Sequence, residues 1–264
     1  MSDSVAFDRA AEYYDATRSI TPEASREITV LLGEELAGRG RCLEIGVGTG
    51  MIALPLAEAG LPMVGIDLSE PMLRKLIEKA GGRASFPVAL GDATALPFAD
   101  GSFDTALARH VFHLMPAWER AIDELVRVVK PGGLILASQG GFSGPWRAVT
   151  ERFMSLVGKT SLAKGLDPRD LDVLDAAFAA RGMPVRLLRP VAERSSETLG
   201  QFIDQMGRGV HSWTWEFDPD TCARAAGQVR EWALDRYGTL DPPASEGYEI
   251  IWRAFDRPAS ALPG

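Results

Sequence analysis

Short apolar runs alternate with amphipathic segments along the first half of the chain. The runs that predict buried strands lie at 42–45, 62–66, 86–90, 103–108 and 134–138. Apolar residues at helical spacing predict helices before and between these runs, at about 21–38, 52–60, 69–80 and 116–130. Strands that alternate with helices are typical of βαβ units, whose crossovers give a parallel sheet with helices on both faces. We therefore expect a doubly wound, Rossmann-like α/β core over about 40–140.

The pattern changes after this core. A helical stretch to about Val157 and a loop or lid over 158–167 come first. Asp167-Pro168 and Asp218-Pro219 each place a capping side chain before a proline, which predicts two further helix starts. The last two strands of a seven-stranded, mostly parallel sheet are predicted at 183–191 and 248–255.

The length favours one elaborated domain. At roughly 150 residues per domain, 264 residues are few for two full domains. We expect a single domain over 1–264, with an N-terminal helical segment before the core. A variable region with a helical insertion or lid then covers about 142–240, and the terminal strand 248–255 follows it.

Composition and charge narrow the class of protein. Hydrophobic residues make up 46% of the chain and charged residues 24%, which indicates a folded globular protein. The net charge is −8 and no Lys/Arg block occurs, which argues against a nucleic-acid partner. No apolar run reaches the ~18–20 residues of a bilayer helix, and the N-terminus has no apolar signal region. With Cys42 and Cys222 far apart as well, we expect a cytoplasmic protein without a membrane partner.

A glycine-rich turn, Gly46-Val-Gly-Thr-Gly50, follows the first predicted strand. The dinucleotide fingerprint needs a glycine at the sixth position, where this chain has Met51, so a nicotinamide oxidoreductase is disfavoured. A phosphate-binding loop would need Lys and Ser or Thr after the turn, and no basic residue lies between Arg41 and Arg74. The turn is therefore not built for phosphate.

Three acids surround the turn: Glu44 before it, Asp67 at the end of the second strand and Asp92 at the end of the third. Asp67 can accept hydrogen bonds from two ribose hydroxyls, and Asp92 from an adenine amine. Together they favour a nucleoside that carries an amino acid and no phosphate. The alternatives are structural: Asp67 as a helix-start acid, and Asp92 as a turn residue. Asp104, within the fourth strand, is assigned to structure.

Five blocks in this order resemble the class I S-adenosylmethionine-dependent methyltransferases, particularly the bacterial small-molecule group of the ubiquinone-biosynthesis type. The blocks are Leu43 to Gly50, Val64 to Ser69, Gly91 to Phe98, Ser102 to Asp104 and Val128 to Gly133. The resemblance covers about Phe7 to Ser138 and implies methyl transfer from S-adenosylmethionine to a small molecule, with S-adenosylhomocysteine as the product.

The resemblance also implies the cofactor-binding residues. Glu44 would order the turn, whose glycines would lie beside the methionine portion; Asp67 would bind the ribose, and Asp92 with Ala93 the adenine. An N-terminal Tyr and Arg would lie over the cofactor carboxylate, although a solvated amphipathic helix explains that segment equally well. The full predicted set is Tyr14, Arg18, Glu44, Gly46, Gly48, Gly50, Asp67, Leu68, Asp92, Ala93 and Arg109.

Two further groups of side chains are candidates for the acceptor side. The candidate catalytic residues are His110, His113 and His211, and the candidate pocket residues are Phe142, Trp146, Trp213 and Trp215. Each has a structural alternative, since a single histidine is more often a hydrogen-bonded structural residue and the tryptophans could pack the insertion onto the core. No Cys, His and Asp cluster has metal-ligand spacing, so no metal is expected.

The predicted chemistry is in-line displacement, in which the protein holds the nucleophile, methyl carbon and sulfur collinear and excludes water. A phenol or alcohol acceptor needs a base, whereas a thiolate or amine does not. The alternative is a non-catalytic S-adenosylmethionine-binding regulator or sensor. Both a monomer and a homodimer are compatible with the sequence.

Overall fold

Seven strands form the central sheet of the computed structural model, which describes residues 3–18, 20–140, 142–161, 163–193, 197–241 and 248–259. Their order is β3-β2-β1-β4-β5-β9-β6, and all neighbours are parallel except β9, which is antiparallel to β5 and β6. The bounds are β1 Cys42–Ile45, β2 Met63–Asp67, β3 Val88–Leu90, β4 Phe103–Arg109, β5 Val129–Ser138, β6 Val185–Leu187 and β9 Arg253–Asp256. The predicted seven-stranded, mostly parallel sheet is confirmed.

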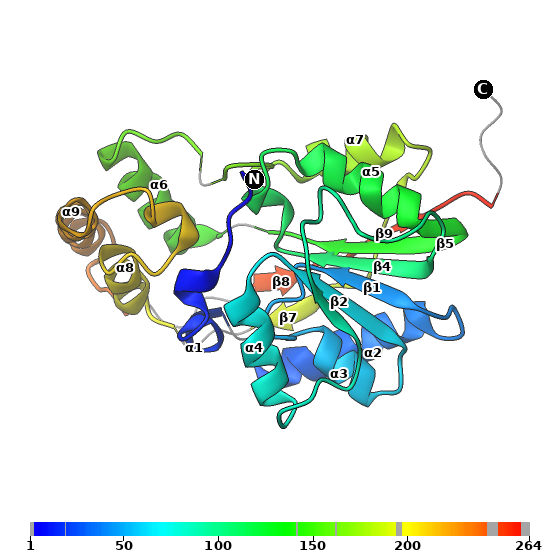
Figure 1. Cartoon of the computed structure of the whole chain (residues 1–264). Coiled ribbons are helices and arrows are strands. Elements are labelled where there is room, and N and C mark those ends of the chain that lie inside the picture. Colours follow the sequence, from blue (N-terminus) through cyan, green and yellow to red (C-terminus); the bar gives the residue numbers. More distant parts are fainter. Residues whose placement is uncertain are drawn as a thin grey trace.

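Helices cover both faces of this sheet (Figure 1). On one face lie α2 Pro22–Leu36, α3 Ala53–Glu58 and α4 Glu70–Lys79; on the other lie α5 Trp118–Val128 and α7 Leu171–Ala179. Successive strand residues alternate between two buried clusters, so Cys42 packs with α2 while Leu43 packs with α5. A sheet buried on both faces explains why its strands appear in the sequence as continuous apolar runs.

Three predicted helix starts are confirmed by their caps. The side chains of Thr21, Ser69 and Asp218 accept hydrogen bonds from the third residue of their helices, at 3.3, 3.3 and 2.8 Å. Asp218 caps α9, Pro219–Tyr237. The predicted start at Asp167 is wrong, because α7 begins at Leu171.

The contacts of Asp167 explain the late start of α7. Its carboxylate accepts hydrogen bonds from the Arg169 guanidinium at 2.8 and 2.7 Å and from the Ser161 hydroxyl at 3.0 Å. These contacts occupy both oxygens of Asp167 in the preceding loop. A residue four places before the helix therefore holds the loop and does not cap the helix.

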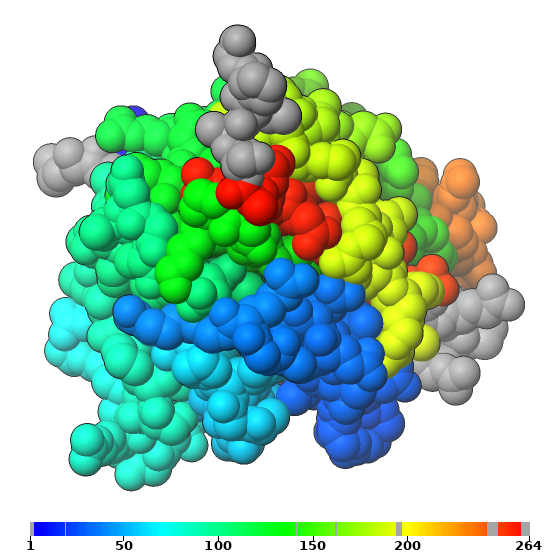
Figure 2. All heavy atoms as spheres, turned by 90° about the vertical axis from the view of Figure 1, so that its right-hand side faces the viewer, coloured from blue at the N-terminus to red at the C-terminus, as the bar shows by residue number. Residues whose placement is uncertain are grey.

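The last two predicted strands each divide into two. The run at 183–191 contains β6 and the start of β7 Val191–Glu193, and the run at 248–255 contains β8 Tyr248–Ile250 and most of β9. Pro190, which has no N–H to donate, separates β6 from β7. β7 and β8 form a separate antiparallel pair, whereas the red residues of β9 lie between green β5 and the yellow segment with β6 (Figure 2).

The remaining helices lie beyond the end of the sheet where β5 stops at Ser138 (Figure 1). α6 Gly144–Leu156, α8 Leu199–Gly207 and α9 pack around a hydrophobic cluster of their own, which we call the lid cluster. The other helices of the described residues are short: η1 Asp8–Ala10, α1 Tyr14–Arg18, η2 Phe112–Leu114 and η3 Ser212–Thr214. Across the described ranges, no helix is both long enough and apolar enough to cross a membrane.

Candidate functional site

The glycine turn stands at the carboxyl end of β1, where the Val47 N–H donates to the Ile66 carbonyl of β2 at 3.0 Å. Gly46, Gly48 and Gly50 have φ of +63°, +54° and +81°, in the left-handed region that favours glycine. A Cβ at Gly46 would also clash with Cγ1 of Val111. The turn thus requires its glycines for its own backbone and packing.

Asp67 joins this turn to the end of β2. Its Oδ2 accepts from the Gly48 N–H and its Oδ1 from the Ser69 N–H, both at 2.8 Å. Burial raises the pKa of Asp67, and these backbone donors lower it. An ionised carboxylate has about four lone-pair sites, so the two bonds leave acceptor capacity for a ligand.

Glu44 is a buried acid beside the turn, with 3% of its surface exposed. Burial raises its pKa to about 8, while the nearby positive charge of Arg109 lowers it. Within the described ranges, Glu44 Oε2 has no hydrogen-bond partner, which is unusual for a buried polar atom. Nη1 of Arg109, the last residue of β4, lies 3.2 Å from the Met51 sulfur.

The predicted adenine side has clear local contacts. Asp92 Oδ1 accepts from both the N–H and the hydroxyl of Thr94 at 2.9 Å, a turn contact of the kind that its structural alternative requires. Leu68 and Ala93 are half-buried next to the strand ends. Asp104 accepts from the Arg41 N–H at 2.8 Å and pairs with Lys130 at 2.6 Å, which are structural contacts.

The N-terminal segment that carries Tyr14 and Arg18 lies over the glycine turn. The Thr49 hydroxyl donates to Asp15 Oδ1 at 2.6 Å, and Lys79 of α4 pairs with Asp15 at 3.0 Å. On its other side, Arg18 Nη2 donates to the Val210 carbonyl at 3.4 Å. Figure 1 shows the blue α1 between α4 and α8. Sequence reasoning missed Asp15 and Thr49, because nothing local marks a contact across 34 positions.

The three histidines, of which His211 is far from the other two in sequence, all lie within electrostatic reach of Arg18. Burial lowers the pKa of all three, to about 4 for His113 and well below the ordinary value for the others, and the Arg18 charge acts in the same direction on each. The rings of His110 and His113 are 6.5 Å apart. Among the described residues that are not glycine, His110 alone has a positive φ, +51°, which is a strained position at a strand end.

The four aromatic candidates have different neighbours. Phe142 and Trp213 both contact His211, with ring centroids 6.2 and 5.2 Å apart, and Trp213 is stacked on it. Trp146 and Trp213 both pack against the lid cluster. Trp215 contacts the Phe7 ring at 5.1 Å and donates to the Gly209 carbonyl at 3.0 Å, so its packing role is directly visible.

Two residues of the small β7–β8 sheet were not predicted. Tyr248 and Glu193 pair in register across it, and both lie within electrostatic reach of Arg109. Glu193 is buried and accepts from the Thr21 N–H at 2.9 Å. Over the part of the chain that the structure describes, no group of three or more His, Cys, Asp or Glu could hold a metal ion.

The strand order with antiparallel β9, and the glycine turn bonded to an acid at the end of β2, define the Rossmann-like methyltransferase class. Residues 43–137 match the protein-family model described as a methyltransferase domain. The predicted class I S-adenosylmethionine-dependent methyltransferase domain is thereby confirmed for these residues. S-adenosylmethionine is the cofactor of this class, and the acidic, phosphate-free turn fits it.

The chain is similar to two curated relatives and to one solved structure. A demethylmenaquinone methyltransferase of Renibacterium salmoninarum is 33% identical over 154 residues, 56% of this chain and 63% of the relative. A malonyl-[acyl-carrier protein] O-methyltransferase of Methylococcus capsulatus is 32% identical over 157 residues, 55% and 56% of the two chains. The chain thus spans less than two thirds of either relative. The [4+2]-cyclase SpnF has the same fold, with a TM-score of 0.60, 20% identity, and coverage of 97% of this chain and 98% of that one.

Proposed function

We propose that the protein transfers the methyl group of S-adenosylmethionine to a small-molecule acceptor by in-line displacement. The observation that carries the proposal is the 2.8 Å bond between Gly48 and Asp67, which brings the glycine turn and the acid together at the carboxyl ends of β1 and β2. Ligands of open α/β sheets bind at these strand ends. The bound cofactor would supply an electrophilic methyl group, and the protein would position it.

The proposed cofactor contacts follow the arrangement of the site. The turn glycines would lie along the methionine portion, Asp67 would accept from the ribose hydroxyls, and the Asp92 loop with Leu68 and Ala93 would border the adenine. Tyr14 and Arg18 would lie over the amino-acid end, because their segment is fixed on the turn through Asp15. Glu44 and Arg109 would support the turn from below.

We propose that the histidines hold the acceptor by hydrogen bonds and do not act as strong bases. A base is most effective when its pKa is near the working pH, and the pKa of His113, about 4, is well below neutrality. Neutral imidazoles offer acceptor nitrogens and add no positive charge beside a sulfonium ion. Nδ1 of His113 and Nε2 of His211 have no hydrogen-bond partner in the described ranges, so both remain available.

The single domain over 1–264, with acceptor contacts from the lid region, is part of the same proposal. The two relatives act, by their names, on demethylmenaquinone and on malonyl-[acyl-carrier protein], so the class does not fix the acceptor. Phe142 and Trp213 are the aromatic residues best placed for it, since both contact His211.

Calorimetry with S-adenosylmethionine, S-adenosylhomocysteine and NAD tests the cofactor. We expect the first two to bind and NAD not to bind, and tight NAD binding would refute the proposal. A panel of phenols, thiols, amines and carboxylic acids with methyl-labelled cofactor then tests transfer. Cofactor binding without transfer to any member of the panel would favour the non-catalytic regulator or sensor.

A further inference from the structure

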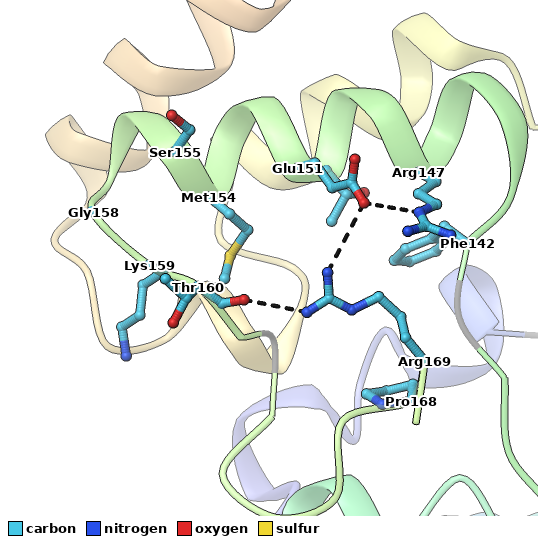
Figure 3. A pocket seen from close by; sticks show the side chains of 11 residues that line it. Phe142, Arg147, Glu151, Met154, Ser155, Gly158, Lys159, Thr160, Pro168 and Arg169 are labelled. Carbon is cyan, nitrogen blue, oxygen red and sulfur yellow. Dashed lines mark hydrogen bonds and ion pairs between the residues drawn. The ribbon is translucent and has the colours of Figure 1, made fainter. Parts of the chain in front are cut away.

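A cavity of about 480 Å³ lies between α6 and the loop that runs from Gly158 to Arg169, away from the glycine turn. Figure 3 shows side chains from both elements pointing into it. Phe142 and Met154 give the cavity its apolar surface, and Thr150, Ser155 and Thr160 add hydroxyl groups. None of these lining residues belongs to the predicted cofactor set.

The lining contains Arg147, Lys159 and Arg169 and a single acid, Glu151. Lys159 is itself paired with Glu216, which lies outside the lining. Glu151 lies between the two arginines, 2.8 Å from Arg147 Nε and 3.9 Å from Arg169 Nη1 (Figure 3). Two guanidinium groups thus approach the same carboxylate oxygen, Oε1.

The two arginines differ in which of their guanidinium nitrogens remain available to a ligand. Arg169 is fixed by a fork on Asp167, at 2.8 and 2.7 Å, and by the Thr160 carbonyl at 3.2 Å. Arg147 has only its Nε engaged, and its two terminal nitrogens make no hydrogen bond to the described residues. A guanidinium with free terminal nitrogens can bind a carboxylate through two parallel bonds.

Two parts of the cavity wall also contact the histidines. Phe142, 36% exposed, lines the cavity and contacts the His211 ring. The loop on the opposite side is held on η2, because the N–H groups of Lys164 and Gly165 donate to the His113 carbonyl at 3.0 and 3.1 Å. A ligand anchored among the arginines would therefore extend past Phe142 toward His113 and His211.

We propose that this cavity binds the carboxylate end of an amphipathic acceptor, with Arg147 as the main donor and Glu151 as an opposing charge. The proposal rests on the proposed function for the identity of the ligand as the acceptor. A carboxylate suits the site better than a phosphate dianion, because Glu151 would repel the second negative charge. The apolar part of such an acceptor would lie against Phe142 and Met154.

Ligand-observed NMR titration with 3-phenylpropionate and its uncharged amide, 3-phenylpropionamide, tests the site. We expect the acid to bind more tightly than the amide. Arg147→Gln should weaken the acid about fivefold, the upper range for a partly exposed ion pair, and leave the amide unchanged. Glu151→Gln should strengthen the acid about threefold, because it removes the opposing charge and keeps a hydrogen-bond acceptor for Arg147.

Arg152→Gln is the matched control, since Arg152 is also an exposed arginine of α6 but does not line the cavity. It should leave the binding of both compounds unchanged. Equal binding of acid and amide, no binding of either, or changes of the same sign in the Arg147 and Glu151 variants would overturn the proposal. Tighter binding of phenyl phosphate would overturn the choice of a carboxylate.

Calorimetry of the wild type and both variants with S-adenosylmethionine keeps the two proposals separate. Unchanged cofactor binding in the variants is expected, because neither residue contacts the glycine turn. If the wild type did not bind S-adenosylmethionine, this would contradict the proposed function but not the anion site. Cofactor binding without acid selectivity would contradict the anion site alone.

Discussion

Glu44→Gln should remove a specific loss of stability that the wild type undergoes as the pH rises from 4.5 to about 8. Glu44 is 3% exposed, and burial raises its pKa from 4.5 to about 8. Between these two values the folded protein keeps a proton that the unfolded chain releases. The stability from this group is therefore fully present below pH 4.5 and is lost as the pH rises to 8. At 1.36 kcal/mol per pH unit, the whole effect is roughly 5 kcal/mol.

Urea unfolding of the wild type and Glu44→Gln, followed by circular dichroism from pH 5 to 8.5, measures this effect. Groups common to both proteins cancel in the difference between their free energies of unfolding, which should change by up to about 1.4 kcal/mol per pH unit in favour of the variant. Glu34→Gln, on the exposed side of α2, controls for the change in net charge. Parallel curves for the wild type and Glu44→Gln would refute the reasoning, because they would mean that Glu44 is ionised in the fold.

Three further predictions test other parts of the site. Gly46→Ala should cost about 2–4 kcal/mol in thermal unfolding, from a left-handed residue plus overpacking on Val111, and an unchanged midpoint would contradict this. On the acid side, the free energy of unfolding of His113→Asn should depend on pH by about one proton less than that of the wild type, which loses stability as the pH falls from 6.5 to about 4. An equally steep curve would show that His113 is protonated when folded. Trp213→Ala should weaken acceptor use much more than cofactor binding, and equal losses in kinetics and calorimetry would reduce Trp213 to a packing residue.

The sequence predicted those parts of the fold that depend on local signals. Buried strands appear as apolar runs, and Thr21, Ser69 and Asp218 stand directly before their helices with free capping oxygens. The errors fall where distant contacts decide. The four strands after residue 183 have only three or four residues each, and their division between two sheets depends on partners about 55 to 120 positions away.

The same distinction applies to the site. Gly48 and Asp67 could be placed at neighbouring strand ends, since parallel strands bring their carboxyl ends to one edge. Their direct hydrogen bond could not be predicted, because it depends on the conformation of the turn. No local pattern indicates that the three histidines all lie near Arg18, because this depends on a contact between Arg18 and Val210, which are 192 positions apart.

The N-terminal segment shows why these distant contacts matter for function. Asp15 fixes it to Thr49 and Lys79, and Arg18 joins it to Val210, between α8 and η3. The side chains of Lys79 and Asp15 are 39% and 44% exposed, so their ion pair contributes less than about 1 kcal/mol. A cofactor that binds along the glycine turn must pass beneath this segment. We therefore expect this weak ion pair to let the segment open at low cost, and its attachment on both sides to return Tyr14 and Arg18 to the same place over the turn.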